Sequence, residues 1–142
     1  MKIGENGLSI IKSFEGLRLM PYMDSVGVWT VGYGSTTDVT PGEPITQAEA
    51  EDRLIKDVEN AEECVNKHVA VPITQNEFDA LCSLVFNVGC GNFRKSTMLR
   101  LLNEGDHDAA AYEFRRWDKA GGQVLAGLTR RRFAEQQLFE RA

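Results

Sequence analysis

Apolar residues near the start of the chain recur at helical spacing, which predicts a short amphipathic helix over residues 6–15. Leu8 and Ile11 lie three residues apart, and Glu15 follows one helical turn later on the same side. Gly16 comes directly after this stripe and is a typical residue for ending a helix. We therefore expect a helix whose last residue is a carboxylic acid on its apolar side.

The pattern then changes to one that is typical of a β-hairpin. Val28–Gly34 is rich in β-branched and aromatic residues, and Asp24–Gly27 offers the polar and glycine residues of a turn. A loop with two prolines, Thr40–Pro44, comes next. Residues 21–37 are therefore predicted to form a small antiparallel hairpin sheet.

Two capping boxes, Thr46–Glu49 and Thr74–Glu77, mark the starts of later helices. The first opens a helix that the pattern continues to about residue 68. The second precedes residues 78–88, which are apolar on most sides and typical of a buried central helix. Beyond a turn at residues 89–92, the pattern predicts helices over 97–104, 108–117 and 128–141, with a loop that starts at Gly121.

These elements indicate an α+β fold in a single domain, residues 1–142. We expect a small N-terminal α/β lobe with a β-hairpin sheet over about residues 12–48. A long connecting helix over about 46–68 would lead to an all-helical C-terminal lobe over about 69–142, and the first helix would pack against that lobe.

The composition is that of an ordinary globular chain, with 42% hydrophobic and 26% charged residues. No apolar run approaches the ~20 residues of a membrane-spanning helix, and the N-terminus lacks the apolar core of a signal peptide. We therefore expect a soluble chain with no stable membrane anchor. The formal net charge of −5 argues against nucleic acid as a partner, because nucleic-acid binders are usually basic.

The chain carries three cysteines, Cys64, Cys82 and Cys90, and two histidines, His68 and His107. It contains no Cys-x-x-Cys pair and no His-Glu-x-x-His motif, so we expect no metal site and interpret the histidines as structural. We expect the cysteines to be reduced, buried apolar side chains. A bridge between Cys82 and Cys90 is an alternative that the sequence leaves open.

The strongest candidates for chemistry are two carboxylic acids, Glu15 and Asp24, with Thr30 close to them along the chain. Glu15 ends an amphipathic helix on its apolar side, where carbonyl dipoles and burial favour the protonated acid. Asp24 lies in a polar turn, where we expect it to stay ionised. Enzymes that hydrolyse glycosidic bonds usually act through two carboxyl groups in contrasting environments. Thr30 could help Asp24 hold a water. Each residue also has a purely structural interpretation.

A resemblance to a known family favours catalysis. Phe14–Leu19, Pro21–Asp24 and Val28–Gly34 contain the pattern Glu, eight residues, Asp, five residues, Thr. In this the chain resembles the bacteriophage-type lysozymes, or endolysins, of the T-even and lambdoid phages. Further matching segments spread over nearly the whole chain: Phe78–Leu81, Phe86–Gly89, Ser96–Arg100, Arg116–Trp117 and Arg130–Arg132.

The resemblance implies a muramidase that cleaves the β-1,4 bond between N-acetylmuramic acid and N-acetylglucosamine in bacterial peptidoglycan and so lyses the host. Glu15 would protonate the leaving oxygen, and Asp24 with Thr30 would position the attacking water. The family pattern aligns Thr36, Phe86 and Thr97 with substrate-binding positions. For these three, core packing or helix capping are alternative interpretations.

The resemblance further implies a monomer that acts on glycan strands with no cofactor or metal. The enzyme would collect in the host cytoplasm and reach the periplasm and cell wall after a separate holin opens the membrane. Two rival functions stay open: a non-catalytic cell-wall-binding domain, and a lytic transglycosylase that forms a 1,6-anhydro product instead of adding water.

The chain departs from the family pattern at one conspicuous position and differs in overall charge. Many relatives have a histidine after the Gly-x-Gly that ends the strand, whereas this chain has Ser35, so a salt bridge of some members would be missing. Some relatives are strongly basic, and this chain is acidic overall. Arg130–Arg132 could supply basic contacts to the wall, or could be the solvated first turn of the last helix.

Overall fold

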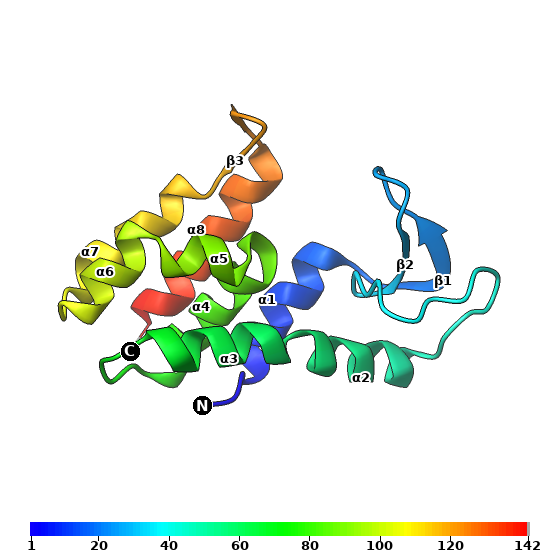
Figure 1. Ribbon diagram of the computed structural model, residues 1–142, viewed down its shortest axis with the longest axis horizontal. Coiled ribbons are helices and arrows are strands. Elements are labelled where there is room, and N and C mark those ends of the chain that lie inside the picture. Colours follow the sequence, from blue (N-terminus) through cyan, green and yellow to red (C-terminus); the bar gives the residue numbers. More distant parts are fainter. Residues whose placement is uncertain (142) are drawn as a thin grey trace. The chain divides into compact units, whose positions relative to one another are not determined.

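The computed structural model describes residues 1–141 and confirms the α+β fold (Figure 1). Helices alternate with two small antiparallel sheets, each of two strands. The elements in chain order are α1 (Glu5–Glu15), β1 (Arg18–Met23), β2 (Trp29–Gly32), α2 (Gln47–Asp57), α3 (Glu59–His68), α4 (Gln75–Val88), α5 (Cys90–Arg94), α6 (Thr97–Asn103), α7 (His107–Tyr112), the 3-10 helix η1 (Glu113–Arg116), β3 (Lys119–Ala120), β4 (Gln123–Val124) and α8 (Ala126–Glu140).

The chain forms two compact units. One, here called the hairpin unit, comprises Ile11–Glu59. The other, called the helical unit, combines Met1–Ile10 with the chain from Asn60 onward. The hairpin unit thus holds Glu15, Asp24 and Thr30 together.

The hairpin unit is built on the antiparallel pairing of β1 with β2. Tyr22 pairs with Thr30 and Met23 pairs with Trp29, while the register shifts between Arg18 and Tyr22. Pro21 lies in this irregular stretch, where its missing N–H costs no ladder hydrogen bond. Helix α2 packs on β2 and completes the unit.

The predicted helix over residues 46–68 is divided by the structure into α2 and α3. The Thr46–Glu49 capping box forms as expected. Val58, between the two helices, is fully buried, and its N–H still donates to the Leu54 carbonyl at 2.9 Å. Its ψ of −11° departs from the ordinary helical value, which interrupts the regular hydrogen-bond ladder at that residue. Residue periodicity does not reveal such a one-residue change of dihedral.

The core of the helical unit is centred on α4. This helix begins at the Thr74–Glu77 capping box and buries Phe78, Leu81 and Leu84 completely. Helix α4 packs against α8, and α6 packs against α7 (Figure 1). The prediction of a buried central helix is therefore confirmed.

The N-terminal segment is fixed to α4 by one carboxylate. Asp79 accepts hydrogen bonds from the backbone N–H groups of Gly4 and Gly7 at 2.9 and 3.1 Å. A side chain on Gly7 would meet the Cβ of Asp79 at 2.9 Å, so the glycine permits this close approach.

Three segments of the helical unit differ from the prediction. The helix predicted over residues 108–117 is divided into α7 and the 3-10 helix η1. Residues 89–92 are not a simple turn, because Cys90 begins the short helix α5. The loop expected at Gly121 is the two-residue turn of the β3–β4 hairpin, in which Gly121 and Gly122 both have positive φ. Among residues 1–141, none of the helices has both the length and the apolar character that a membrane span requires.

Candidate active site

Glu15 is the last residue of α1 and is half-buried. The helix stops there because Gly16 adopts a positive φ of 74° while its N–H donates to the Lys12 carbonyl at 3.0 Å. The predicted helix end is thus confirmed, and it places an acid where the chain turns from α1 into β1.

The backbone beyond β2 approaches the Glu15 carboxyl group closely. A Cβ atom added to Gly34 would lie 3.1 Å from Oε1 of Glu15, and Gly34 has a positive φ of 83°. Only glycine meets both conditions without displacement or strain. Glu15 therefore lies against the segment that directly follows the strand of Thr30.

Asp24 is held in the turn of the hairpin by its own side chain. Its Oδ1 accepts hydrogen bonds from the N–H groups of Val26 and Val28, at 3.0 and 2.8 Å. Its backbone N–H donates to the Val28 carbonyl at 2.9 Å, which continues the ladder beyond the Met23–Trp29 pair. The carboxylate is thus fixed through one oxygen, and among the described residues Oδ2 accepts no hydrogen bond.

Thr30 lies on β2 opposite Tyr22 and is 4% exposed. Because side chains alternate along a strand, Asp24, two residues after Tyr22, is on the same face of the hairpin as Thr30. The Thr30 hydroxyl donates its hydrogen to the Val28 carbonyl at 3.0 Å. Its oxygen is consequently available only as an acceptor.

The loop after β2 is held by residues that sequence patterns did not single out. Arg53 of α2 donates to the carbonyls of Thr37 and Asp38 at 2.5 and 3.0 Å, and to Oγ of Ser35 at 3.3 Å. Ser35 is buried and forms a β-bridge with Val31. Ser35 and the loop after it are therefore joined to α2 by hydrogen bonds.

Asp57 belongs to the same cluster. Burial raises the pKa of the Asp57 carboxyl, while its hydrogen bond with Ser35 and the positive charge of Arg53 act in the opposite direction. Arg53 and Asp57 are four residues apart on α2, and this i, i+4 spacing is the signal by which a sequence could have indicated the cluster.

The three predicted substrate-binding residues are distributed over both units. Thr36 is exposed in the hairpin unit, directly after Ser35. Phe86 is half-buried on α4 and packs against the core of the helical unit. Thr97 is exposed at the first position of α6 and lines a pocket of about 310 Å³ together with Trp117. Their role in binding stays a prediction.

Arg131 and Arg132 are not part of a solvated helix turn. They are 4% and 2% exposed and both lie beside Glu135, which is fully buried on the same helix. Nε of Arg132 lies 2.7 Å from Oε1 of Glu135, and Nε of Arg131 lies 3.3 Å from Oε2. Ser83 of α4 also donates to Oε2, at 2.5 Å. The structure therefore removes two of the three arginines from any wall-binding surface, and Arg130 alone is exposed.

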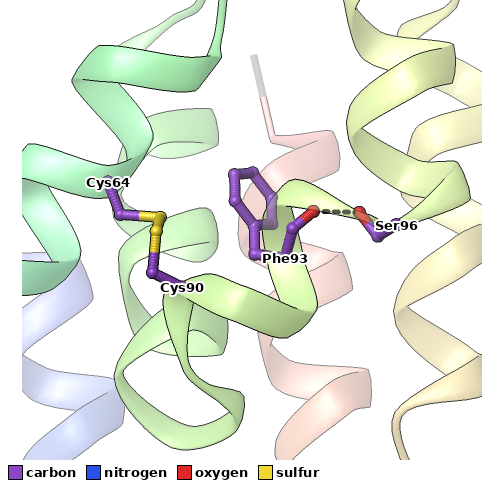
Figure 2. The surroundings of a disulfide bond; sticks show 4 residues. All are labelled: Cys64, Cys90, Phe93 and Ser96. Atoms are coloured by element: carbon purple, nitrogen blue, oxygen red, sulfur yellow. Dashed lines mark hydrogen bonds between the residues drawn. A yellow bond between two sulfur atoms is a disulfide. The ribbon is translucent and has the colours of Figure 1, made fainter.

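The expectation of reduced cysteines is wrong for Cys64 and Cys90 and confirmed for Cys82. Cys64 of α3 and Cys90 of α5 form a disulfide, with Cα atoms 5.8 Å apart, so the Cys82–Cys90 bridge is excluded (Figure 2). Cys82 is a free, fully buried thiol on α4. Because the partners lie on different helices, their pairing depends on tertiary structure.

A family model described as phage lysozyme matches residues 12–135. An endolysin of Acyrthosiphon pisum secondary endosymbiont phage 1 is 47% identical over an alignment of 146 positions. The alignment covers 100% of this chain and 100% of that protein. An endolysin of Bacillus phage PZA is 49% identical over 142 residues, covering 98% of this chain and 55% of the relative. A SAR-endolysin of bacteriophage PS119 is 45% identical over 125 residues, covering 87% of this chain and 75% of the relative.

Solved structures agree with these relatives. The muramidase domain of SpmX from Asticaccaulis excentricus matches with a TM-score of 0.92 at 41% identity, covering 99% of both chains. A mutant of P22 lysozyme matches with a TM-score of 0.92 at 40% identity, covering 98% of both. Because the family model covers most of the chain and the first of these relatives matches it from end to end, the chain belongs to the phage lysozyme family.

Proposed function

We propose that this peptidoglycan-degrading endolysin hydrolyses the β-1,4 bond between N-acetylmuramic acid and N-acetylglucosamine. Family membership supports a peptidoglycan hydrolase. The finer assignment rests on the chemistry that Glu15, Asp24 and Thr30 can perform in the hairpin unit.

The observation that carries the proposal is the arrangement of acceptors on one face of the hairpin. Asp24 uses Oδ1 for two backbone donors, so Oδ2 is left to accept from a water molecule. The Thr30 hydroxyl has given its hydrogen to Val28 and can only accept. A water that donates to both residues directs its lone pairs away from them, which is the orientation a nucleophile needs.

Glu15 supplies the acid in this proposal. Its carboxyl group lies against Gly34, two residues after the strand that carries Thr30. In the proposed reaction Glu15 protonates the glycosidic oxygen as the bond to the sugar breaks, and the water held by Asp24 and Thr30 adds to the anomeric carbon. Asp24 accepts the proton that the water loses.

Analysis of digestion products by mass spectrometry tests the proposal. Hydrolysis by a muramidase gives fragments with reducing N-acetylmuramic acid ends. Anhydro ends would instead identify a lytic transglycosylase, and intact strands a non-catalytic wall-binding domain. Glu15→Gln should remain folded and lose at least about 100-fold in turnover, since general acid catalysis contributes roughly 10²–10⁴-fold. Wild-type turnover by Glu15→Gln would remove Glu15 from the mechanism.

Endolysins act on the cell wall after release from the cytoplasm, and our proposal includes release through a holin. The SAR-endolysin among the relatives favours the alternative of release without a holin. Expression of this chain in a host that lacks a holin distinguishes the two. Intact cells that lyse only after membrane permeabilisation support the holin route, and spontaneous lysis contradicts it.

A further inference from the structure

Three metal-binding side chains meet at one place in the helical unit. Cys64 and His68 are one turn apart on α3, and Cys90 begins α5. One ligand atom from each, the two sulfurs and a ring nitrogen, all lie within 4.8 Å of one another. The i, i+4 spacing of Cys64 and His68 is visible in the sequence, but it identifies a site only when Cys90 is placed beside it.

The distances suit a single cation if the sulfurs are not bonded to each other. Zinc binds thiolate sulfur at about 2.3 Å and imidazole nitrogen at about 2.0–2.1 Å in tetrahedral geometry. Two sulfurs around one zinc ion are then about 3.8 Å apart. Opening of the Cys64–Cys90 bond would let the two sulfurs separate to this distance.

The backbone around the cluster is held by contacts other than the disulfide. Phe93 of α5 is fully buried, and its carbonyl accepts a hydrogen bond from Oγ of Ser96 at 2.6 Å (Figure 2). At the end of α3, the Asn103 side chain donates to the His68 carbonyl at 2.9 Å and accepts from the Ala70 N–H at 2.8 Å. We therefore expect Cys90 and His68 to stay in place after reduction.

The cluster borders a pocket, with His68 and Cys90 half-buried and Cys64 buried. Cys64, His68 and Cys90 line an open pocket of about 520 Å³ with Asn60, Glu63, Lys67, Gly91 and Arg94. Two thiolates neutralise a divalent cation, so the occupied site would add no net positive charge beside Lys67 and Arg94. The open pocket leaves the fourth coordination position to water.

We propose that Cys64, His68 and Cys90 bind a thiophilic divalent cation, with Zn²⁺ as the expected ion, when the Cys64–Cys90 disulfide is reduced. A dithiol reductant gives two electrons and two protons to the sulfurs and itself becomes a disulfide. Each cysteine then releases its proton as the metal binds. The ion would join α3 to α5 in the reduced protein, as the disulfide does in the oxidised protein.

Cobalt spectroscopy on the full chain tests this proposal. The protein is reduced with a phosphine, freed from it without oxygen and titrated with Co²⁺, whose bonds to thiolate give charge-transfer bands. We expect these bands in the reduced protein, their loss on addition of Zn²⁺, and none in the oxidised protein. His68→Ala should weaken Co²⁺ binding at least about tenfold.

His107→Ala is the matched control, because His107 contacts Glu77 instead of the cluster, and it should bind Co²⁺ like the wild type. A second measurement needs no variant: Zn²⁺ should slow alkylation of Cys64 and Cys90 in the reduced protein. The proposal is overturned if reduced protein gives no thiolate–cobalt bands, if His68→Ala binds as tightly as the wild type, or if Zn²⁺ leaves alkylation unchanged.

Discussion

Oε1 of Glu15 lies so close to Gly34 that a methyl group there would sit 3.1 Å from it. The contact joins the end of α1 to the segment after β2, and thereby sets the position of the proposed acid relative to the strand of Thr30. It also depends on a glycine whose φ of 83° other residues rarely adopt.

Gly34→Ala should therefore lower activity more than stability. The added methyl group displaces the Glu15 carboxyl group, and a shift of about 1 Å can cost about 100-fold in rate. Gly42→Ala is the matched control, because Gly42 has a φ of 84° and open space around its Cβ position. Both variants carry about 1–2 kcal/mol of backbone strain, so their midpoint temperatures of thermal unfolding should fall by similar amounts. Equal turnover of the two variants would contradict this role of Gly34.

Thr30→Val should lose about 100-fold in turnover if the hydroxyl oxygen holds the attacking water. Valine has nearly the same shape, so the buried position should remain filled, although the hydrogen bond to the Val28 carbonyl is lost. Thr30→Ser keeps the hydroxyl and should retain most activity. Turnover with soluble glycan fragments measures both variants, and an active Thr30→Val would exclude the hydroxyl from water positioning.

Asp57 should make the protein less stable as pH rises from acidic values. Burial raises the pKa of Asp57 above its ordinary value of 3.8, so the folded state keeps the proton longer than the unfolded chain does. The free energy of unfolding therefore falls between about pH 3.8 and the raised pKa. Asp57→Asn removes this dependence, and its stability relative to the wild type should increase across that window.

Urea unfolding of Asp57→Asn and wild type at several pH values measures the effect. Asp52→Asn is the control, because Asp52 is an exposed carboxylate on the same helix. A stability difference that is the same at every pH, or one that Asp52→Asn reproduces, would rule out Asp57 as its source.

Glu135→Ala should cost about 3–5 kcal/mol of stability, because it leaves the buried guanidinium of Arg132 without its counter-charge. Glu104→Ala is the comparison, since Glu104 pairs with Arg100 on the surface and such pairs contribute at most about 1 kcal/mol. Denaturant unfolding of the two variants measures the contrast. A loss below about 1 kcal/mol for Glu135→Ala would show that the contacts of Glu135 with Arg131 and Arg132 contribute little to the free energy of unfolding.

Local signals in the sequence predicted the local features correctly. The two capping boxes and Gly16 determine helix ends through hydrogen bonds within a few residues, so the boundaries at Gln47, Gln75 and Glu15 could be placed closely. The turn at Asp24 and the strand at Thr30 follow from equally short-range chemistry. These are the features that position the candidate catalytic residues.

Features that depend on contacts distant in sequence were missed. A solvated turn was one interpretation of Arg131 and Arg132, because a residue pattern does not show that Glu135 is buried. In the folded chain Glu135 contacts Ser83 of α4. The partner of Cys90 could not be chosen among three cysteines, since α3 and α5 meet only in the folded chain. The interruption at Val58 likewise reflects packing, because the apolar pattern continues through it.

The buried thiol of Cys82 has a consequence for how the disulfide is maintained. Burial is the main cause that raises the pKa of Cys82, and the nearby charges of Glu62 and Asp79 act in the same direction. Only a thiolate attacks a sulfur–sulfur bond, so Cys82 does not take part in thiol–disulfide exchange in the folded chain. Once Cys64 and Cys90 have joined, the native fold itself prevents shuffling to either mispaired isomer.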